Sequence, residues 1–212
     1  MTELLDLSPD ELLTTTRAVR RRMDFERPVS LELVRECIEV AVQAPSGSNA
    51  QGWHFVVVTD AAKRNALADL YRKAFEIYAR MPGSAGAAST GDPSHDATQQ
   101  RVRSSAAYLA ENMHRPPVLV IACIEQRIDG DQLLSSASVL GSILPAAWSF
   151  CLAARARGLG TSWTTLHLMF ESEAAEVLGV PHDEVSQVAL LPVAHTLGTG
   201  FKRAPRGPLD EV

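Results

Sequence analysis

Four arginines stand close together near the N-terminus of a chain that is otherwise acidic. They are Arg17, Arg20, Arg21 and Arg22, in a protein of 212 residues with a formal charge of −5 at pH 7. Guanidinium groups form forked, charge-assisted hydrogen bonds with phosphate, so this segment is a candidate anion-binding site. If it is helical, Arg17 and Arg21 share one face at i, i+4. The alternative is a solvated helix C-terminus, where positive charge is favourable without a ligand.

A second candidate is the polar loop over residues 45–51, which reads PSGSNAQ. Its hydroxyl, amide and backbone N–H groups lie within a few residues of one another and suit the polar edge of a heterocycle. Proline, serine, glycine and asparagine are also the usual residues of turns, so an ordinary turn is the alternative interpretation.

Histidines and cysteines offer few further candidates. His167 follows Trp163–Leu166, a segment suited to a pocket wall, although a core residue is the simpler interpretation. Cys37, Cys123 and Cys151 are far apart, have apolar neighbours and form no CxxC pair. We therefore predict buried thiols and no metal site.

Several functional classes are disfavoured by the motifs and the charge. The GLGT sequence at residues 158–161 lacks the third glycine of a dinucleotide fingerprint and follows a predicted helix instead of a strand. No GxSxG, HExxH or DFG-like set occurs, which weighs against proteases, kinases and α/β-hydrolases. The negative net charge disfavours a general binder of nucleic acid or anionic lipid.

The elements that must position these residues alternate between helix and strand. Ser8 begins a helix that we expect to run towards Arg22. Ser30 begins a second helix that ends before Pro45, and Asp60 caps a third. Apolar and β-branched runs predict buried strands at residues 53–59, 118–124 and 185–193 and a strand beginning near 161. Later helices are predicted at 132–154 and at 173–178, the second of them closed by Gly179.

Composition favours one folded domain over residues 1–212. Hydrophobic residues make up 46% of the chain and charged residues 21%, which excludes a disordered chain. Residues 81–95 are predicted to be a mobile loop or lid, and residues 198–212 an irregular tail. Because helices outweigh strands and few strands are joined by short hairpins, we predict an α+β fold with a mixed sheet flanked by helices.

The sequence favours a cytoplasmic protein. Its start, MTELLDLSPDELL, is acidic where a secretory signal is basic, and scattered cysteines in odd number suit a reducing compartment. Residues 132–154 carry no charge and are long enough to cross a bilayer, but serines and Pro145 interrupt them. We expect a helix buried in the core or in a subunit interface.

In combination, these features resemble the FMN-dependent nitroreductase family. The shared order is an arginine-rich segment, a PSGSNAQGW loop leading into a strand, an uncharged helix, GLGTSW and a basic tail. The resemblance covers nearly the whole chain from Arg17 onward, and the segment from Pro45 to Trp53 is its most specific part. It implies an α/β/α sandwich with a mainly antiparallel central sheet. It also implies an intertwined homodimer with two FMN sites at the subunit interface.

The resemblance also assigns candidate FMN contacts. Arg17 and Arg21 would meet the flavin phosphate and ribityl chain, and a shift of register would place Arg20 there instead. The loop at residues 45–49 would come from the partner subunit, and Arg206 would close over the phosphate. The backbone near Thr165 would lie beside flavin N5. The complete set is Arg17, Ala18, Val19, Arg21, Pro45, Ser46, Gly47, Asn49, Thr164, Thr165, Leu166 and Arg206.

The implied activity is hydride transfer carried by the cofactor. NADH or NADPH would reduce FMN at N5, and a nitroaromatic, quinone or similar planar acceptor would then take the electrons in a ping-pong mechanism. The protein contributes positioning, so no catalytic triad is required, and His167 is the one candidate side chain for proton chemistry. Two alternatives are a flavin-storage protein with little turnover, in which Trp163 or His167 blocks the stacking face, and a partner-binding domain without flavin.

Overall fold

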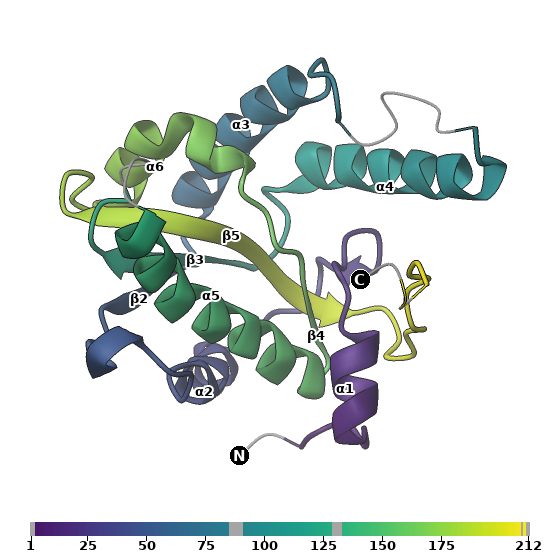
Figure 1. The fold of residues 1–212 in the computed structure, drawn as a ribbon, viewed down its shortest axis with the longest axis horizontal. Coiled ribbons are helices and arrows are strands. Elements are labelled where there is room, and N and C mark those ends of the chain that lie inside the picture. Colours follow the sequence, from purple (N-terminus) through teal and green to yellow (C-terminus); the bar gives the residue numbers. More distant parts are fainter. Residues whose placement is uncertain (1–2, 85–90, 129–132, 209, 211–212) are drawn as a thin grey trace.

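The computed structural model describes residues 3–84, 91–128, 133–208 and 210, and an antiparallel sheet lies at its centre (Figure 1). The strands are β1 (Met23–Asp24), β2 (Trp53–Val58), β3 (Val118–Glu125), β4 (Leu159–Thr161) and β5 (Val185–Thr196). Their order is β1-β5-β3-β2, and β4 also pairs with β5. The strand pairs are all antiparallel, which confirms the predicted mainly antiparallel sheet.

Helices cover both faces of this sheet. The α-helices of the described residues are α1 (Pro9–Thr15), α2 (Leu31–Ala41), α3 (Ala61–Tyr78), α4 (Pro93–Asn112), α5 (Leu133–Ala156) and α6 (Glu171–Leu178), and short 3-10 helices occur at η1 (Gly47–Asn49) and η2 (Leu166–Phe170). One core lies between the sheet and α2 and α5; the other lies between the sheet and α3 and α6 (Figure 1). The predicted α+β sandwich is therefore confirmed.

Strand β3 contributes to both cores. Val118, Val120 and Ala122 belong to the core covered by α2 and α5, whereas Leu119 and Ile121 belong to the core covered by α3 and α6. Alternate side chains of a strand point to opposite faces, so a strand covered on both sides needs an unbroken apolar run. The buried strand expected at residues 118–124 is confirmed.

Strand β2 is less buried than its sequence predicts. It pairs with β3 and stands at the end of the strand order in the described part of the chain. Within it only Val58 is buried, and His54 is exposed. The prediction of a strand is correct, but the prediction that it is buried is wrong, because an apolar run does not reveal whether a strand stands at an edge.

The predicted helix starts at Ser8, Ser30 and Asp60 are confirmed. Each side-chain oxygen accepts a hydrogen bond from the backbone N–H three residues further on. Such bonds satisfy donors that a helix cannot satisfy itself. At the other end of a helix, Gly179 has a φ of 76° and closes α6 as expected.

The first helix ends earlier than predicted. α1 stops at Thr15, and residues 17–22 are not helical. Ala18 instead forms a parallel β-bridge with Thr161, and the N–H of Val19 donates to the Thr161 carbonyl at 2.8 Å. The predicted i, i+4 arrangement of two arginines on one helix face is therefore wrong, because a contact distant in sequence draws this segment to the sheet.

Gly160 permits this close approach. A Cβ atom at this position would lie 2.9 Å from Cβ of Val19 and 2.8 Å from a methyl carbon of Thr196. The GLGT sequence thus serves to pack the arginine-rich segment against β4. This strand begins at Leu159 and ends at Thr161, earlier than expected, whereas β5 continues past residue 193 to Thr196.

Helix α5 matches the uncharged helix predicted at residues 132–154, although residue 132 lies outside the described residues. The helix is long and apolar enough to cross a membrane by length and composition alone, and half of its most apolar window is buried. Ile143 and Phe150 pack in the core beside α2, while Leu144 and Trp148 remain exposed. The core-helix prediction is therefore supported, with one apolar face left open in the single chain.

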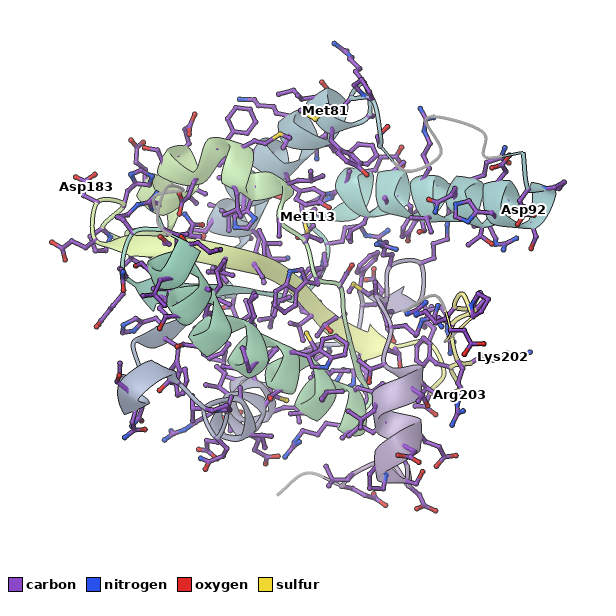
Figure 2. The ribbon with its side chains drawn as sticks, viewed as in Figure 1. Met81, Asp92, Met113, Asp183, Lys202 and Arg203 are labelled. Atoms are coloured by element: carbon purple, nitrogen blue, oxygen red, sulfur yellow. The ribbon has the colours of Figure 1, made fainter. Side chains whose placement is uncertain are left out.

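Helices α3 and α4 flank the loop predicted at residues 81–95. Residues 85–90 lie outside the described part of the chain. The predicted end of the loop is too late, because α4 begins at Pro93 and Asp92 caps it by accepting from the Ser94 N–H at 2.8 Å. Met113 lies at the inner end of α4 and is buried, whereas Asp92 lies at the outer end (Figure 2).

Candidate functional site

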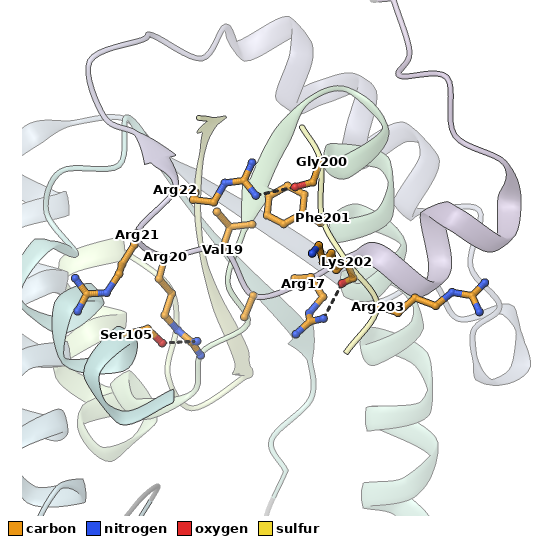
Figure 3. A pocket seen from close by; sticks show the side chains of 11 residues that line it. Arg17, Val19, Arg20, Arg21, Arg22, Ser105, Gly200, Phe201, Lys202 and Arg203 are labelled. Atoms are coloured by element: carbon orange, nitrogen blue, oxygen red, sulfur yellow. Dashed lines mark hydrogen bonds between the residues drawn. The ribbon is translucent and has the colours of Figure 1, made fainter. Parts of the chain in front are cut away.

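A cavity of about 570 Å³ lies between the arginine-rich segment and the C-terminal tail (Figure 3). Its charged lining residues are all cations, so we call it the arginine cavity. It is lined by Arg17, Ala18, Val19, Arg20, Arg21, Arg22, Ser105, Gly200, Phe201, Lys202 and Arg203. A concave surface lined by charges of one sign concentrates ligands of the opposite sign, here anions.

Arg22 holds the tail that forms one wall of this cavity. Its guanidinium donates four hydrogen bonds of 2.7–3.0 Å to carbonyl oxygens between Leu197 and Gly200. It also lies over the Phe201 ring, 4.2 Å from the centroid, and buried Arg155 lies 4.9 Å from the same centroid. Both arginines thus contact the tail, although Nε and Nη1 of Arg155 are buried without a hydrogen-bond partner among the described residues.

Arg17 and Arg21 are directed to different elements. Arg17 Nη1 donates to the Lys202 carbonyl at 2.9 Å, so it also contacts the tail. Arg21 is exposed, donates to Oγ of Ser104 at 2.8 Å and lies 4.9 Å from the centroid of the Tyr108 ring. Both residues line the arginine cavity, but α4 already engages the guanidinium of Arg21.

Arg20 connects the arginine cavity to a second one. Its Nη1 donates to Oγ of Ser105 at 3.2 Å, and its Nε is buried without a partner among the described residues. Burial lowers the pKa of Arg20, although an arginine remains charged at neutral pH. Leaving a buried donor unpaired is costly. The sequence did not decide whether Arg20 or Arg21 contacts the ligand. Of the two, Arg20 has the position suited to a bound ligand.

The second cavity, of about 260 Å³, has aromatic walls, and we call it the aromatic cavity. Tyr71, Phe75 and Tyr78 come from one face of α3, and Trp163 comes from the segment after β4. The complete lining is Arg20, Tyr71, Phe75, Tyr78, Ala79, Ser84, Val102, Arg103, Ala106, Trp163, Thr164, Thr165 and Leu166. Such a cavity suits a planar ring.

Thr164 attaches one wall of the aromatic cavity to the central sheet. Its backbone exchanges hydrogen bonds of 3.2 and 2.9 Å with Leu190, and its hydroxyl donates to the Leu190 carbonyl at 2.6 Å. Burial raises the pKa of Tyr71, which lines the same cavity, to about 12. The predicted residues Thr165 and Leu166 therefore stand on a wall whose position the sheet fixes.

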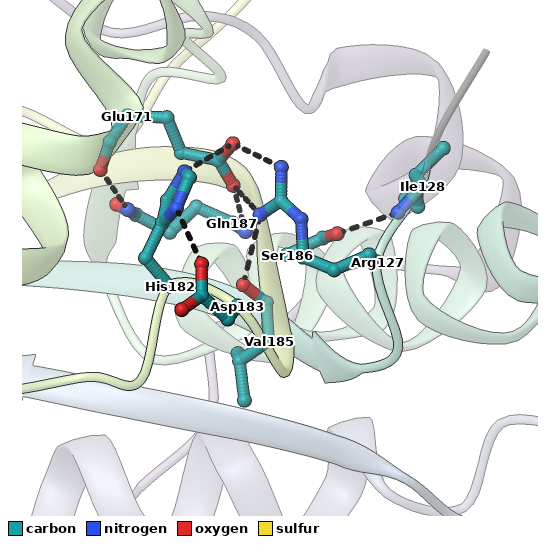
Figure 4. A network of polar contacts seen from close by, with 8 residues as sticks. All are labelled: Arg127, Ile128, Glu171, His182, Asp183, Val185, Ser186 and Gln187. Carbon is teal, nitrogen blue, oxygen red and sulfur yellow. Dashed lines mark hydrogen bonds and ion pairs between the residues drawn. The ribbon is translucent and has the colours of Figure 1, made fainter.

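A polar network holds α6, which follows η2 directly (Figure 4). Arg127 donates to both carboxylate oxygens of Glu171, at 3.0 and 2.9 Å, and the Gln187 N–H donates to the same carboxylate at 2.8 Å. Burial alone would raise the pKa of Glu171, but these hydrogen bonds outweigh it and the pKa is lowered. The network joins the segment after β3 to β5 and α6 and so restrains η2, which precedes α6 directly.

His167 lines neither cavity. Its side chain is fully buried, and neither ring nitrogen has a partner among the described residues. Burial lowers its pKa to about 4, so the imidazole is uncharged at neutral pH. The geometry therefore supports a core residue. Proton chemistry at His167 stays a prediction, and no hydrogen bond of its ring nitrogens among the described residues supports it.

The predicted loop residues 45–49 lie away from both cavities within one chain. The Gly47 N–H donates to Oγ of Ser142 on α5 at 2.9 Å. Ser48 and Asn49 adopt left-handed φ angles of 51° and 54°, a conformation that costs energy in residues other than glycine. The structure therefore does not bring the loop together with the arginine cavity, which leaves its assignment to a partner subunit as a prediction.

Arg206 also lies outside both cavities. It is exposed, and its Nη1 donates to the carbonyl of Pro205 at 3.0 Å. Lys202 and Arg203 of the same tail do line the arginine cavity. The structure thus brings other basic tail residues to the predicted site and leaves the role of Arg206 untested.

Sequence reasoning missed the aromatic face of α3. Tyr71, Phe75 and Tyr78 recur at i, i+4 and i+7, which places them on one side of a helix. That spacing was visible, but it is also typical of a face that packs in a core. Ser84 and Arg103 gave no signal, because only the fold brings them to the same cavity.

The model of the nitroreductase family matches residues 13–195 of this chain. Nitrobenzene nitroreductase of Ectopseudomonas oleovorans is 28% identical over 207 residues, covering 83% of this chain and 82% of the relative. Iodotyrosine deiodinase bound to FMN and 3-iodo-L-tyrosine has the same fold, with a TM-score of 0.71, 20% identity and coverage of 94% of this chain and 95% of that chain. An FMN and NADPH-dependent nitroreductase from Sphigopyxis sp. strain HMH gives a TM-score of 0.69, 22% identity and coverage of 97% of each chain.

Proposed function

This chain belongs to the nitroreductase family of flavoprotein oxidoreductases, and from that premise we propose that it is an FMN-dependent enzyme. It takes hydride from NADH or NADPH and passes it to a nitroaromatic, a quinone or a similar planar acceptor by a ping-pong mechanism. The observation that carries the proposal is the position of Arg20, which lines both cavities and so joins a cationic site to an aromatic one.

The residues of the two cavities fit FMN. The cations of the arginine cavity suit its phosphate, and the rings of the aromatic cavity suit its planar ring system. Arg20 supplies a buried donor where the cavities meet. Val19 contributes packing only, because its N–H is already bonded to Thr161. Arg17 and Arg20 would hold the phosphate and ribityl end, and Thr164–Leu166 would border the ring.

FMN supplies the hydride chemistry when it is bound. The chain's own contribution is to position and shield the reactants. The half-buried charge of Arg20 stabilises negative charge that develops on a ligand during reduction. Hydrogen bonds from Thr164 to β5 fix one wall in advance, so little ordering is needed on binding. With its pKa raised to about 12, Tyr71 keeps its proton at neutral pH and can act as a hydrogen-bond donor.

The proposal includes a homodimer in which each site uses both chains. Leu144 and Trp148 on α5 are exposed at 37% and 42%, and large exposed apolar side chains on one helix are typical of an interaction surface. The loop at residues 45–49 contacts the same helix through Ser142. Pairing through α5 would carry the loop to a second copy, where it can complete a site that one chain leaves open.

We also propose that the enzyme works in the cytoplasm. Cys37, Cys123 and Cys151 are buried free thiols, and burial raises their pKa values to about 12, 12 and 11. Thiols of this kind are protonated and unreactive at neutral pH. Their state is compatible with a reducing compartment.

The flavin-storage alternative rests on Trp163. This side chain lines the aromatic cavity and can occupy the space of a stacked acceptor, whereas His167 does not line it. A storage protein would release one hydride equivalent slowly and would not turn over. Trp163→Ala would then raise turnover, and in the enzyme that we propose it would not.

Steady-state kinetics test the proposed function. The FMN-loaded protein is assayed with NADH or NADPH as donor and nitrobenzene or a quinone as acceptor. A ping-pong enzyme gives parallel double-reciprocal lines over a range of acceptor concentrations, with many turnovers per flavin. Absence of multiple turnover with either donor and both acceptors would contradict the proposal.

A further inference from the structure

The aromatic cavity carries two positive charges, and one of them is not shared with the arginine cavity. Its charged lining residues are Arg20 and Arg103, and its described lining contains no carboxylate. Arg20 comes from the arginine-rich segment and also lines the arginine cavity, where the phosphate of FMN would lie. Arg103 comes from α4 and lines the aromatic cavity without lining the arginine cavity. Its charge is therefore available to the planar ring.

The buried hydroxyl of Ser84 is an independent sign that the aromatic cavity holds a ligand with polar atoms. The residue is 6% exposed and lines this cavity, and its Oγ has no hydrogen-bond partner in the described part of the chain. A buried hydroxyl without a partner is destabilising unless a ligand or a water satisfies it. Arg103 has a contact within the chain, but a guanidinium has five donors and can bind a ligand as well.

We propose that Arg103 and Ser84 bind the polar edge of the flavin ring and that Arg103 raises the reduction potential of bound FMN; this inference rests on the proposed function. The carbonyl oxygens of that edge accept hydrogen bonds from the Arg103 guanidinium and the Ser84 hydroxyl. Reduction by two electrons places negative charge on this edge, whereas the oxidised ring is neutral. A fixed cation therefore stabilises the reduced ring more than the oxidised one.

The charge of Arg103 links the affinity for the cofactor to its reduction potential. A protein that binds reduced FMN more tightly than oxidised FMN raises the potential of the bound cofactor by thermodynamic linkage. For a two-electron couple, a tenfold preference for the reduced form corresponds to about 30 mV. Ser84 is neutral, so its hydrogen bond distinguishes less between the two forms than a charged donor does. Arg103 therefore acts chiefly on the potential, and Ser84 chiefly on binding.

Equilibrium reduction of the FMN-loaded protein by dithionite, with a dye of known potential in the same solution, measures the midpoint potential. We expect Arg103→Gln to lower this potential by at least about 30 mV, a tenfold loss of preference for the reduced form. Its Kd for oxidised FMN should change by less than about threefold. Arg103→Lys keeps the charge and should retain most of the potential. Ser84→Ala should raise the Kd for oxidised FMN several-fold and lower the potential by less than Arg103→Gln does.

Arg101→Gln is the matched control, because it removes the same charge from the same helix. Arg101 donates to Oγ1 of Thr98 at 2.8 Å and does not line the aromatic cavity, so its replacement should leave the potential unchanged. Equal shifts in Arg101→Gln and Arg103→Gln would overturn the inference, because the net charge of α4 would then set the potential. A fall in Arg103→Lys as large as that in Arg103→Gln, or a loss of oxidised FMN from Arg103→Gln, would also overturn it.

Failure of the proposed function is distinguishable from failure of this inference, because the potential is measured without NADH, NADPH or an acceptor. A potential that depends on Arg103, in a protein that does not turn over, would support the inference and reject the proposed enzyme. An unchanged potential in Arg103→Gln, in a protein that turns over many times, would reject the inference and support the enzyme. A protein that takes up no FMN would reject both proposals.

Discussion

Arg20 and Arg22 are two residues apart and have the same side chain, yet the fold uses them differently. Arg22 donates hydrogen bonds to carbonyl oxygens of the tail and lies over the Phe201 ring. Arg20 donates one hydrogen bond to Ser105, has a buried Nε without a partner in the described part of the chain, and lines both cavities. A cluster of cations therefore does not identify a ligand site by itself. The partners of each donor, together with whether the side chain lines a cavity, distinguish a structural arginine from one available to a ligand.

The largest effect is expected at Arg20. Arg20→Ala removes a charge-assisted donor worth about 1.5 to 3 kcal/mol, so we expect the Kd for FMN to rise roughly tenfold to 150-fold. Arg20→Lys keeps the charge and should retain part of the affinity. Flavin fluorescence titration of the flavin-free protein measures each Kd. An increase of less than about threefold in the Kd of Arg20→Ala would contradict the role that we assign to Arg20.

His167 is a useful contrast to Arg20, because its buried ring nitrogens also have no partner among the described residues but it lines neither cavity. Burial lowers its folded-state pKa to about 4, below the ordinary value near 6.5. The unfolded chain therefore binds more protons between these values, and folding stability falls as pH drops from 6.5 towards 4. At pH 5 the loss relative to pH 7 is about 2 kcal/mol. Urea unfolding of the unaltered protein and of His167→Phe at pH 5 and pH 7 isolates the contribution of His167. An equal loss of folding stability in the two proteins would contradict the lowered pKa that we assign to His167.

Arg22→Ala should affect the fold more than the ligand. Removing its contacts to the tail and to Phe201 should lower the free energy of unfolding by about 1 to 2 kcal/mol. Trypsin should also cut more readily at Lys202 and Arg203 once the tail is released. Chemical denaturation and limited proteolysis measure the two effects. Unchanged stability together with a large loss of FMN affinity would reverse the roles that we assign to Arg20 and Arg22.

Arg21 and Arg206 should have the smallest effect on FMN binding. Arg21 is engaged by Ser104 and Tyr108, and Arg206 lines neither cavity. We expect each alanine variant to change the Kd for FMN by less than about threefold. The family resemblance alone predicts a larger loss, of roughly tenfold or more, because it assigns each a charge-assisted contact. The same titration decides between the two expectations.

Local signals in the sequence predicted the fold well where the physics is local. The caps at Ser8, Ser30 and Asp60 and the left-handed closure at Gly179 depend on a few neighbouring residues. The end of α1 was predicted too late, because the β-bridge from Ala18 reaches a strand far along the chain. The edge position of β2 was missed for the same reason.

The candidate site was predictable only in part. Family resemblance pointed to residues 17–19, 21 and 164–166, and the structure brings both segments to adjoining cavities. It also pointed to residues 45–49 and to Arg206, which line neither cavity. It did not reveal which arginine joins the two cavities, because that depends on where the backbone turns after α1. The aromatic face of α3 was not recognised, because the same spacing of rings is typical of a helix face packed in a core. Arg103 gave no signal in the sequence, because only the packing of α4 brings it to the aromatic cavity.

The visible absorption spectrum under anaerobic conditions shows whether the two cavities hold an FMN that a nicotinamide donor can reduce. The account predicts that the protein, purified with FMN or reconstituted with it, shows flavin bands that bleach when NADH or NADPH is added. It also predicts that the bands return on addition of a nitroaromatic or a quinone. A folded protein that remains colourless and takes up no FMN would contradict the assignment of the two cavities, and flavin bands that neither donor bleaches would contradict the proposed oxidoreductase.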